Sequence, residues 1–149
     1  MKRFYLIRGK RCSIFEEERI DMIFGIGIDT IEVPRIEKTI AGYGDQFLHR
    51  IYTDGEISYC NWRKLSAEHF AARFAAKEAF AKAIGTGIRR GFIWKEVEVT
   101  KEYSGKPLIE LRGSMIEKVK KIIGAEYQMQ VSLSHTKDIA DAIVVIEKL

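Results

Sequence analysis

Asp29, Glu78 and Lys82 are the side chains of this sequence whose types and spacing could carry out chemistry. Glu78 and Lys82 are four residues apart, so on a helix they lie one turn apart on the same side. If the fold brings Asp29 beside Glu78, the two carboxylates suit Mg²⁺, which keeps several waters and recruits phosphate oxygens, and Lys82 would face those phosphates. Alone, the Glu78–Lys82 pair would be a solvated pair that stabilises its helix, and Asp29 a turn or cap residue.

Two other segments have a structural and a ligand-binding interpretation. Gly85-Thr86-Gly87 is typical of a helix end, where the C-terminal dipole repels phosphate. A ligand there would be bound by local N–H groups or by the threonine hydroxyl. His135 stands at a predicted turn, where a lone histidine often has only a local hydrogen-bonding role.

Several common sites are excluded by the sequence. Gly25-Ile26-Gly27 lacks the third glycine of a dinucleotide-binding fingerprint, and no phosphate-binding P-loop motif occurs. The histidines are too scattered to form a local metal motif.

The elements that would position these residues begin near Met22. Apolar residues alternate with Gly25 and Gly27, which predicts a strand that ends at Asp29 and whose glycine face leaves room for a close approach. Pro34 then favours the start of a short helix, which Gly42 and Gly44 would stop.

Helices are predicted at three further places. Thr53 and Glu56 form a capping-box pattern. Ser66 would cap a long helix over residues 67–84, whose core face is the stripe of Phe70, Phe74, Ala81 and Ile84. A second capping box is predicted at Ser114 and Glu117, with the helix ending at Gly124.

The remaining segments read as strands. Residues 94–100 and 107–111 form a predicted hairpin, and strict alternation over residues 127–134 indicates a strand whose antiparallel partner is the apolar segment 140–146. With no internal repeat or linker, the sequence predicts an α+β fold in which an antiparallel sheet packs with the long central helix.

Composition places the chain among globular proteins. It has 149 residues, 46% hydrophobic and 31% charged, which predicts one folded domain. The net charge of +4 arises in residues 1–11, so residues 12–149 are close to neutral and nucleic-acid binding is not expected. Two distant cysteines fit a reducing, cytoplasmic location. The longest apolar run, residues 142–146, predicts no membrane span.

Four segments together resemble the holo-acyl-carrier-protein synthase family. They are residues 24–29 (FGIGID), 70–87 (FAARFAAKEAFAKAIGTG), 105–107 (GKP) and 131–136 (VSLSHT). The resemblance covers Met22 to the C terminus, so residues 22–149 are expected to form the phosphopantetheinyl transferase domain and residues 1–21 an N-terminal extension.

The resemblance implies transfer of the 4′-phosphopantetheine arm of coenzyme A to a serine of apo-acyl carrier protein, releasing adenosine 3′,5′-bisphosphate. It also implies Mg²⁺ and a homotrimer with active sites between neighbouring subunits. By position, Asp29 and Glu78 would hold the metal, Lys82 would contact the pyrophosphate, and Arg35 would meet the carrier protein. The expected coenzyme A contacts are Lys82, Gly85, Thr86, Gly87, Lys106, Pro107, His135 and Thr136.

A second hypothesis is a non-catalytic trimeric module that binds coenzyme A or a nucleotide as a regulator. The presence of both carboxylates and Lys82 favours the enzyme, because a binding module gains little from metal ligands.

Overall fold

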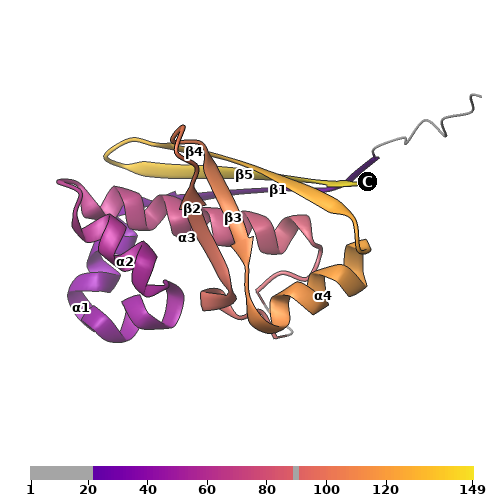
Figure 1. Ribbon diagram of the computed structural model, residues 1–149. Coiled ribbons are helices and arrows are strands. Elements are labelled where there is room, and N and C mark those ends of the chain that lie inside the picture. Colours follow the sequence, from indigo (N-terminus) through magenta and orange to yellow (C-terminus); the bar gives the residue numbers. More distant parts are fainter. Residues whose placement is uncertain (1–21, 89–90) are drawn as a thin grey trace, which may run out of the picture.

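The computed structural model describes residues 22–88 and 91–149, so the predicted extension, residues 1–21, lies outside the described residues. Three antiparallel strands form the main sheet in the order β1-β5-β4, and the long helix α3 lies along one face of it (Figure 1). A separate two-stranded hairpin, β2-β3, crosses α3 and contacts β4 at the edge of the sheet. The strands are β1 (Met22–Glu32), β2 (Val97–Lys101), β3 (Pro107–Leu111), β4 (Tyr127–His135) and β5 (Ile139–Lys148).

Helices α1 and α2 lie at one end of α3, and α4 lies near the other end (Figure 1). The helices are α1 (Val33–Ile51), α2 (Asp54–Asn61), α3 (Ser66–Ala83) and α4 (Gly113–Ile123), and a short 3₁₀ turn, Trp94–Glu96, precedes β2. The predicted α+β class with an antiparallel sheet and a long central helix is confirmed. Within the described residues, no helix combines the length and apolar character needed to span a bilayer.

The close approach of β1 to α3 depends on glycine. A Cβ atom on Gly27 would lie 1.9 Å from the Ala79 carbonyl oxygen, and one on Gly25 would lie 2.1 Å from that of Ala83. The helix presents alanines to this contact, and both Ala79 and Ala83 are buried. The predicted close approach to the glycine face is therefore confirmed. Because side chains alternate along a strand, Asp29 shares the face of Gly25 and Gly27 and points toward α3.

Several predicted boundaries were wrong. Strand β1 continues past Asp29 to Glu32, because it stays paired with β5 over its whole length. In α1 the predicted interruption is confirmed at Gly44, whose φ of 51° and ψ of −134° are not helical, but the helix passes through Gly42 and resumes after Gly44 to end at Ile51. The capping box at Thr53 and Glu56 is confirmed.

The other two predicted caps do not form as expected. Ser66 is the first residue of α3 rather than its cap, and α4 begins at Gly113 without a side-chain cap. The Ser114 hydroxyl instead donates to Glu96, whose carboxylate also accepts the Met115 amide. Glu96, which is distant in the sequence, therefore accepts a hydrogen bond at the start of α4 in place of the local side chain that the capping-box pattern predicts.

Helix α3 is buried over far more of its surface than the predicted stripe. Its buried residues include Arg73 and Lys77 as well as most of its alanines. The sheet covers one side, while the hairpin and the α1–α2 layer cover others (Figure 1). The helix that carries Glu78 and Lys82 is therefore the central element of the core.

Candidate active site

The fold brings Asp29 and Lys82 into direct contact. The Lys82 ammonium donates to Asp29 Oδ1 at 2.8 Å and to the Ile28 carbonyl oxygen at 2.9 Å. The Asp29 side chain is only 15% exposed, whereas that of Lys82 is half exposed. The alternative reading, in which Lys82 only stabilises its own helix, is wrong: the lysine joins α3 to β1.

Glu78 lies close enough to Asp29 for the two charges to interact. Burial raises the pKa of Glu78, the negative charge of Asp29 raises it further, and the charges of Lys82 and Arg35 oppose the shift. Asp29 and Glu78 therefore repel each other, and a bound cation would relieve that repulsion. This is the arrangement that the sequence analysis required, with two carboxylates and a lysine at the crossing of β1 and α3.

The donor set fits Mg²⁺ with open coordination positions. In residues 22–88 and 91–149, no group of three or more histidine, cysteine or acidic side chains could hold a metal ion. Two carboxylates are enough for Mg²⁺, because this ion completes its octahedron with waters and with phosphate oxygens of a substrate.

A buried ion pair fixes α3 from the side away from the sheet. Lys77, fully buried, donates to Glu56 Oε2 at 2.7 Å and to the carbonyl oxygens of Ile51 at 2.8 Å and Trp94 at 3.0 Å. Burial lowers the pKa of Lys77, and the neighbouring Glu56 opposes this shift. Glu56, expected only as a capping residue, also accepts the Val99 amide. The residue next to Glu78 thus ties α3 to α1, α2 and β2.

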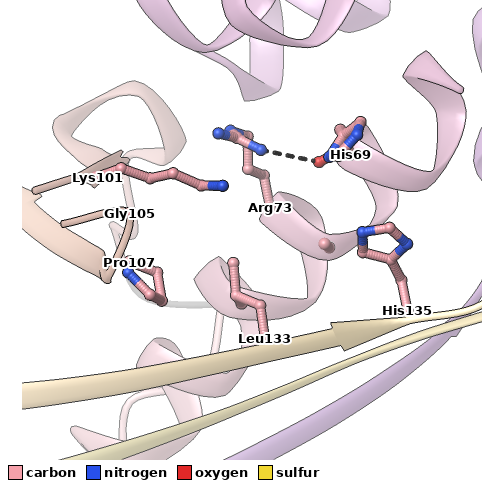
Figure 2. A pocket seen from close by; sticks show the side chains of 8 residues that line it. His69, Arg73, Lys101, Gly105, Pro107, Leu133 and His135 are labelled. Atoms are coloured by element: carbon pink, nitrogen blue, oxygen red, sulfur yellow. Dashed lines mark hydrogen bonds between the residues drawn. The ribbon is translucent and has the colours of Figure 1, made fainter. Parts of the chain in front are cut away.

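A cavity of about 190 Å³ lies between the first turns of α3, the hairpin and the end of β4. Figure 2 shows Lys101 extending from the hairpin toward Arg73, with the rings of His69 and His135 on the other side. Its lining residues are His69, Ala72, Arg73, Lys101, Gly105, Pro107, Leu133 and His135.

The polar lining of this cavity is mostly basic. Arg73 is only 3% exposed, and its NH1 donates to the His69 carbonyl oxygen at 3.3 Å. Its Nε has no hydrogen-bond partner. Burial lowers the pKa of His69, and so do the positive charges of His135, Arg73, Arg63 and Lys101. A buried guanidinium with an unused donor indicates an anionic ligand.

His135 is held by a carboxylate. Its Nδ1 lies 2.9 Å from Glu68 Oε2, and its ring meets that of His69 edge to face with centroids 5.1 Å apart. With Nδ1 engaged by Glu68, the remaining ring nitrogen is the one available to a ligand.

The expected coenzyme A contacts lie in different surroundings. Pro107 and His135 line the cavity, and so does Gly105. Lys106 lies between Gly105 and Pro107 in the sequence. Thr136 closes the β4–β5 turn, its hydroxyl accepting the amides of Asp138 and Ile139.

The glycine segment forms the end of α3. Gly85 and Gly87 have φ values of 74° and 59°, so both use the left-handed conformation that favours glycine. The Gly87 amide donates to the Ala81 carbonyl oxygen, and the Thr86 hydroxyl donates to the Gly87 carbonyl oxygen. Helix termination is thus confirmed, and coenzyme A contact by this segment stays a prediction.

Sequence reasoning missed three polar residues of the cavity, His69, Arg73 and Lys101. Arg73 lies inside the segment 70–87 that carries the resemblance, but its charge was not singled out. A basic residue within an otherwise apolar helical stretch was the available signal, because such a residue is rarely buried without a purpose. No local pattern marks Lys101.

A carboxylate pair and a lysine at the crossing of β1 and α3, together with a cationic cavity beside the first turns of α3, define a site for substrates that carry phosphates. The comparisons identify its class: the model of the 4′-phosphopantetheinyl transferase superfamily matches residues 25–142, so the chain belongs to this family. Within it, the chain is 47% identical over 126 residues to the holo-[acyl-carrier-protein] synthase of Koribacter versatilis, covering 85% of this chain and 99% of the relative. The corresponding protein of Methylobacterium radiotolerans is 42% identical over 130 residues, covering 86% and 96%.

Solved structures agree. The holo-[acyl-carrier-protein] synthase of Neisseria meningitidis matches with a TM-score of 0.76 and 35% identity, covering 85% of this chain and 100% of that one. A synthase from Bacillus anthracis, in complex with CoA (3′,5′-ADP), matches with a TM-score of 0.70 and 38% identity, covering 86% and 99%. The chain is therefore an enzyme that transfers phosphopantetheine from coenzyme A to apo-acyl carrier protein, as the resemblance implied.

Proposed function

We propose that Asp29, Glu78 and Lys82 form the catalytic centre of this transfer, with Mg²⁺ held by the two carboxylates. The observation that carries the proposal is the convergence of Asp29 with Lys82 at 2.8 Å and with the charge of Glu78. When bound, Mg²⁺ supplies positive charge to the pyrophosphate oxygens of coenzyme A.

In the reaction, the carrier-protein serine gives its proton to a carboxylate of the site as its oxygen bonds to the phosphorus of the 4′-phosphopantetheine arm, and the pyrophosphate bond to the adenosine 3′,5′-bisphosphate breaks. The leaving phosphate gains negative charge in the transition state. Lys82 is half exposed and is oriented by the hydrogen bonds that it donates to Asp29 and to the Ile28 carbonyl oxygen, so it is placed to stabilise that charge.

We assign the cavity around Arg73 to the phosphate groups of the nucleotide half of coenzyme A. Arg73 and Lys101 supply the positive charge, His69 and His135 contribute imidazole rings, and Pro107 contributes an apolar wall. Gly85, Thr86, Gly87, Lys106 and Thr136 stay proposed contacts on the strength of the family motif.

A homotrimer is proposed because one face of the sheet is apolar and uncovered. Opposite α3, the main sheet exposes Phe24, Ile26, Ile28 and Ile143, with Ile26 at 57% and Ile28 at 62% exposure. A contiguous apolar surface of this kind is typical of a subunit interface.

Carrier protein is proposed to dock near Arg35, which is exposed on the first turns of α1 and whose charge acts on Glu78. We also assign residues 22–149 to the transferase domain and residues 1–21 to an extension, supported by the family match over residues 25–142. The cytoplasmic location stays a prediction.

The catalytic assignment is tested by replacing Lys82→Ala and measuring transfer to apo-acyl carrier protein by mass spectrometry. Turnover should fall about 10²–10³-fold, as for loss of one preorganised electrostatic group. Lys120→Ala is the matched control, because Lys120 is a similarly exposed helical lysine paired with Glu117 at 3.2 Å. A Lys82→Ala enzyme as fast as the control would remove Lys82 from the catalytic centre.

A further inference from the structure

Tyr59, on α2, has three cationic side chains around its ring. The Arg73 guanidinium carbon lies 4.1 Å from the ring centroid, that of Arg63 lies 4.6 Å from it, and the Lys101 ammonium lies 5.2 Å from it. These cations come from α3, from the segment before it, and from β2. Distances below about 6 Å are those at which a cation is attracted by the π face of an aromatic ring.

Glu56 and Glu98 line the cavity that Tyr59 shares with Arg73 and Lys101, but neither carboxylate forms an ion pair with these cations in the described part of the chain. Among the ion pairs of the described part of the chain, none joins Arg63, Arg73 or Lys101 to an acidic side chain. Arg73 is buried, and the Nε atoms of both arginines have no hydrogen-bond partner. A buried cation without a counter-ion is costly, so Arg73 depends on its contact with the ring of Tyr59 and on its hydrogen bond to the His69 carbonyl oxygen.

The hydroxyl of Tyr59 interacts with one of the same cations. Burial raises the pKa of Tyr59, but the hydrogen bond to Lys101 and the charges of Lys101, Arg63 and Arg73 outweigh burial and lower it. The π face therefore contacts Arg73, whereas Lys101 lies near both the ring and the hydroxyl.

Tyr59 lies behind these cations rather than in the phosphate cavity. It lines an adjacent cavity of about 270 Å³ together with Arg73 and Lys101, and it is not among the residues that line the first cavity. Arg73 and Lys101 line both, so they separate Tyr59 from the proposed ligand. Figure 2 shows these two side chains converging above the first cavity.

We propose that Tyr59 is a positioning residue that holds Arg73 and Lys101 at the wall of the phosphate cavity and so sets the affinity for the nucleotide half of coenzyme A. This inference rests on the proposed assignment of that cavity. An aromatic ring suits the task better than a carboxylate. A carboxylate would neutralise Arg73 and compete with the phosphate, whereas the ring orients the cation and leaves its charge to the ligand.

The test compares Tyr59→Leu, which removes the π face, with Tyr59→Phe, which keeps it and removes only the hydroxyl. Tyr43→Leu is the matched control, because Tyr43 is 68% exposed on α1. The dissociation constant for adenosine 3′,5′-bisphosphate is measured by calorimetry, KM and kcat are measured with coenzyme A, and the Tm of each variant is recorded.

We expect Tyr59→Leu to raise both the dissociation constant for adenosine 3′,5′-bisphosphate and the KM for coenzyme A about tenfold. This loss is in the range of a desolvated cation–π contact. The kcat at saturating coenzyme A should change less than threefold, because Tyr59 is remote from the reacting phosphate. Tyr59→Phe should retain most of the affinity and Tyr43→Leu all of it. Should Tyr59→Leu fail to fold, Tyr59→Met removes the π face with less loss of volume.

The variant Arg73→Ala distinguishes a failure of this inference from a failure of the cavity assignment on which it rests. If Arg73→Ala loses affinity and Tyr59→Leu does not, the positioning role of Tyr59 is overturned while the cavity assignment stands. If Arg73→Ala also binds like wild type, the cavity is not the nucleotide site and the inference falls with it. A Tyr59→Leu variant with lower Tm and unchanged affinity would show a structural role only.

Discussion

Replacing Gly27→Ala should damage both stability and catalysis, because this glycine sets the distance between β1 and α3. The added Cβ would lie 1.9 Å from the Ala79 carbonyl oxygen and 2.7 Å from the Ala83 amide nitrogen, both backbone atoms that cannot rotate away. Since Cβ contacts below 3.0 Å are essentially never found, the helix and strand must separate by about 1.1 Å at this point.

That displacement falls where the proposed catalytic residues meet. Asp29 is two residues from Gly27 on the same face of β1, and its ion pair with Lys82 spans the gap that must widen. Overpacking of this kind costs roughly 1–3 kcal/mol of unfolding free energy. A misplacement of about 1 Å can lower turnover about 10²-fold.

The assay is thermal or denaturant unfolding together with turnover on apo-acyl carrier protein. Gly42→Ala is the matched control, because a Cβ at Gly42 meets nothing within 4 Å and the residue lies inside α1. The control should be as stable as wild type or slightly more so, since alanine favours a helix. A Gly27→Ala enzyme with wild-type stability and turnover would refute the account of how the site is positioned.

Three further outcomes are expected. Burial raises the pKa of Cys60 from 9.0 to about 12, so above pH 9 the unfolded thiol ionises while the folded one stays protonated. The free energy of unfolding should therefore fall as pH rises above 9, and it should fall less steeply in Cys60→Ala. Equal pH profiles of the two proteins would contradict this. Arg35→Glu should raise the KM for carrier protein and weaken its salt dependence, since acidic carrier proteins are expected to meet a screened basic surface, and an unchanged KM would move the docking site elsewhere. Wild type should be a trimer by light scattering and Ile28→Lys, on the exposed sheet face, should not; a monomeric, active wild type would defeat the trimer proposal.

The sequence predicts most of the fold because its local signals are strong. Alternation around Gly25 and Gly27 predicts both β1 and its close contact with a neighbour, and the capping box at Thr53 forms as expected. The boundaries that were wrong depend on long-range partners. Pairing with β5 extends β1 past Asp29, and Glu96 replaces the local cap of α4.

The candidate site also has a part that the sequence predicts and a part that depends on long-range packing. The types and spacing of Asp29, Glu78 and Lys82 are visible in the sequence, but their convergence depends on the packing of β1 on α3. The cavity around Arg73 was predicted only in part: Pro107 and His135 were expected ligand contacts, but Arg73 and Lys101 come from α3 and β2 and meet only in the folded chain.

The most direct test of the catalytic assignment is a calorimetric titration of Mg²⁺ into the enzyme with coenzyme A present, for wild type, Asp29→Asn and Glu78→Gln. Both variants keep the size of the side chain and remove one ligand charge, so Mg²⁺ affinity should fall at least about tenfold in each, with the fold retained. Glu117→Gln, on the exposed side of α4, should bind Mg²⁺ like wild type. Unchanged Mg²⁺ affinity in folded Asp29→Asn and Glu78→Gln would contradict the assignment of these two carboxylates as the metal site.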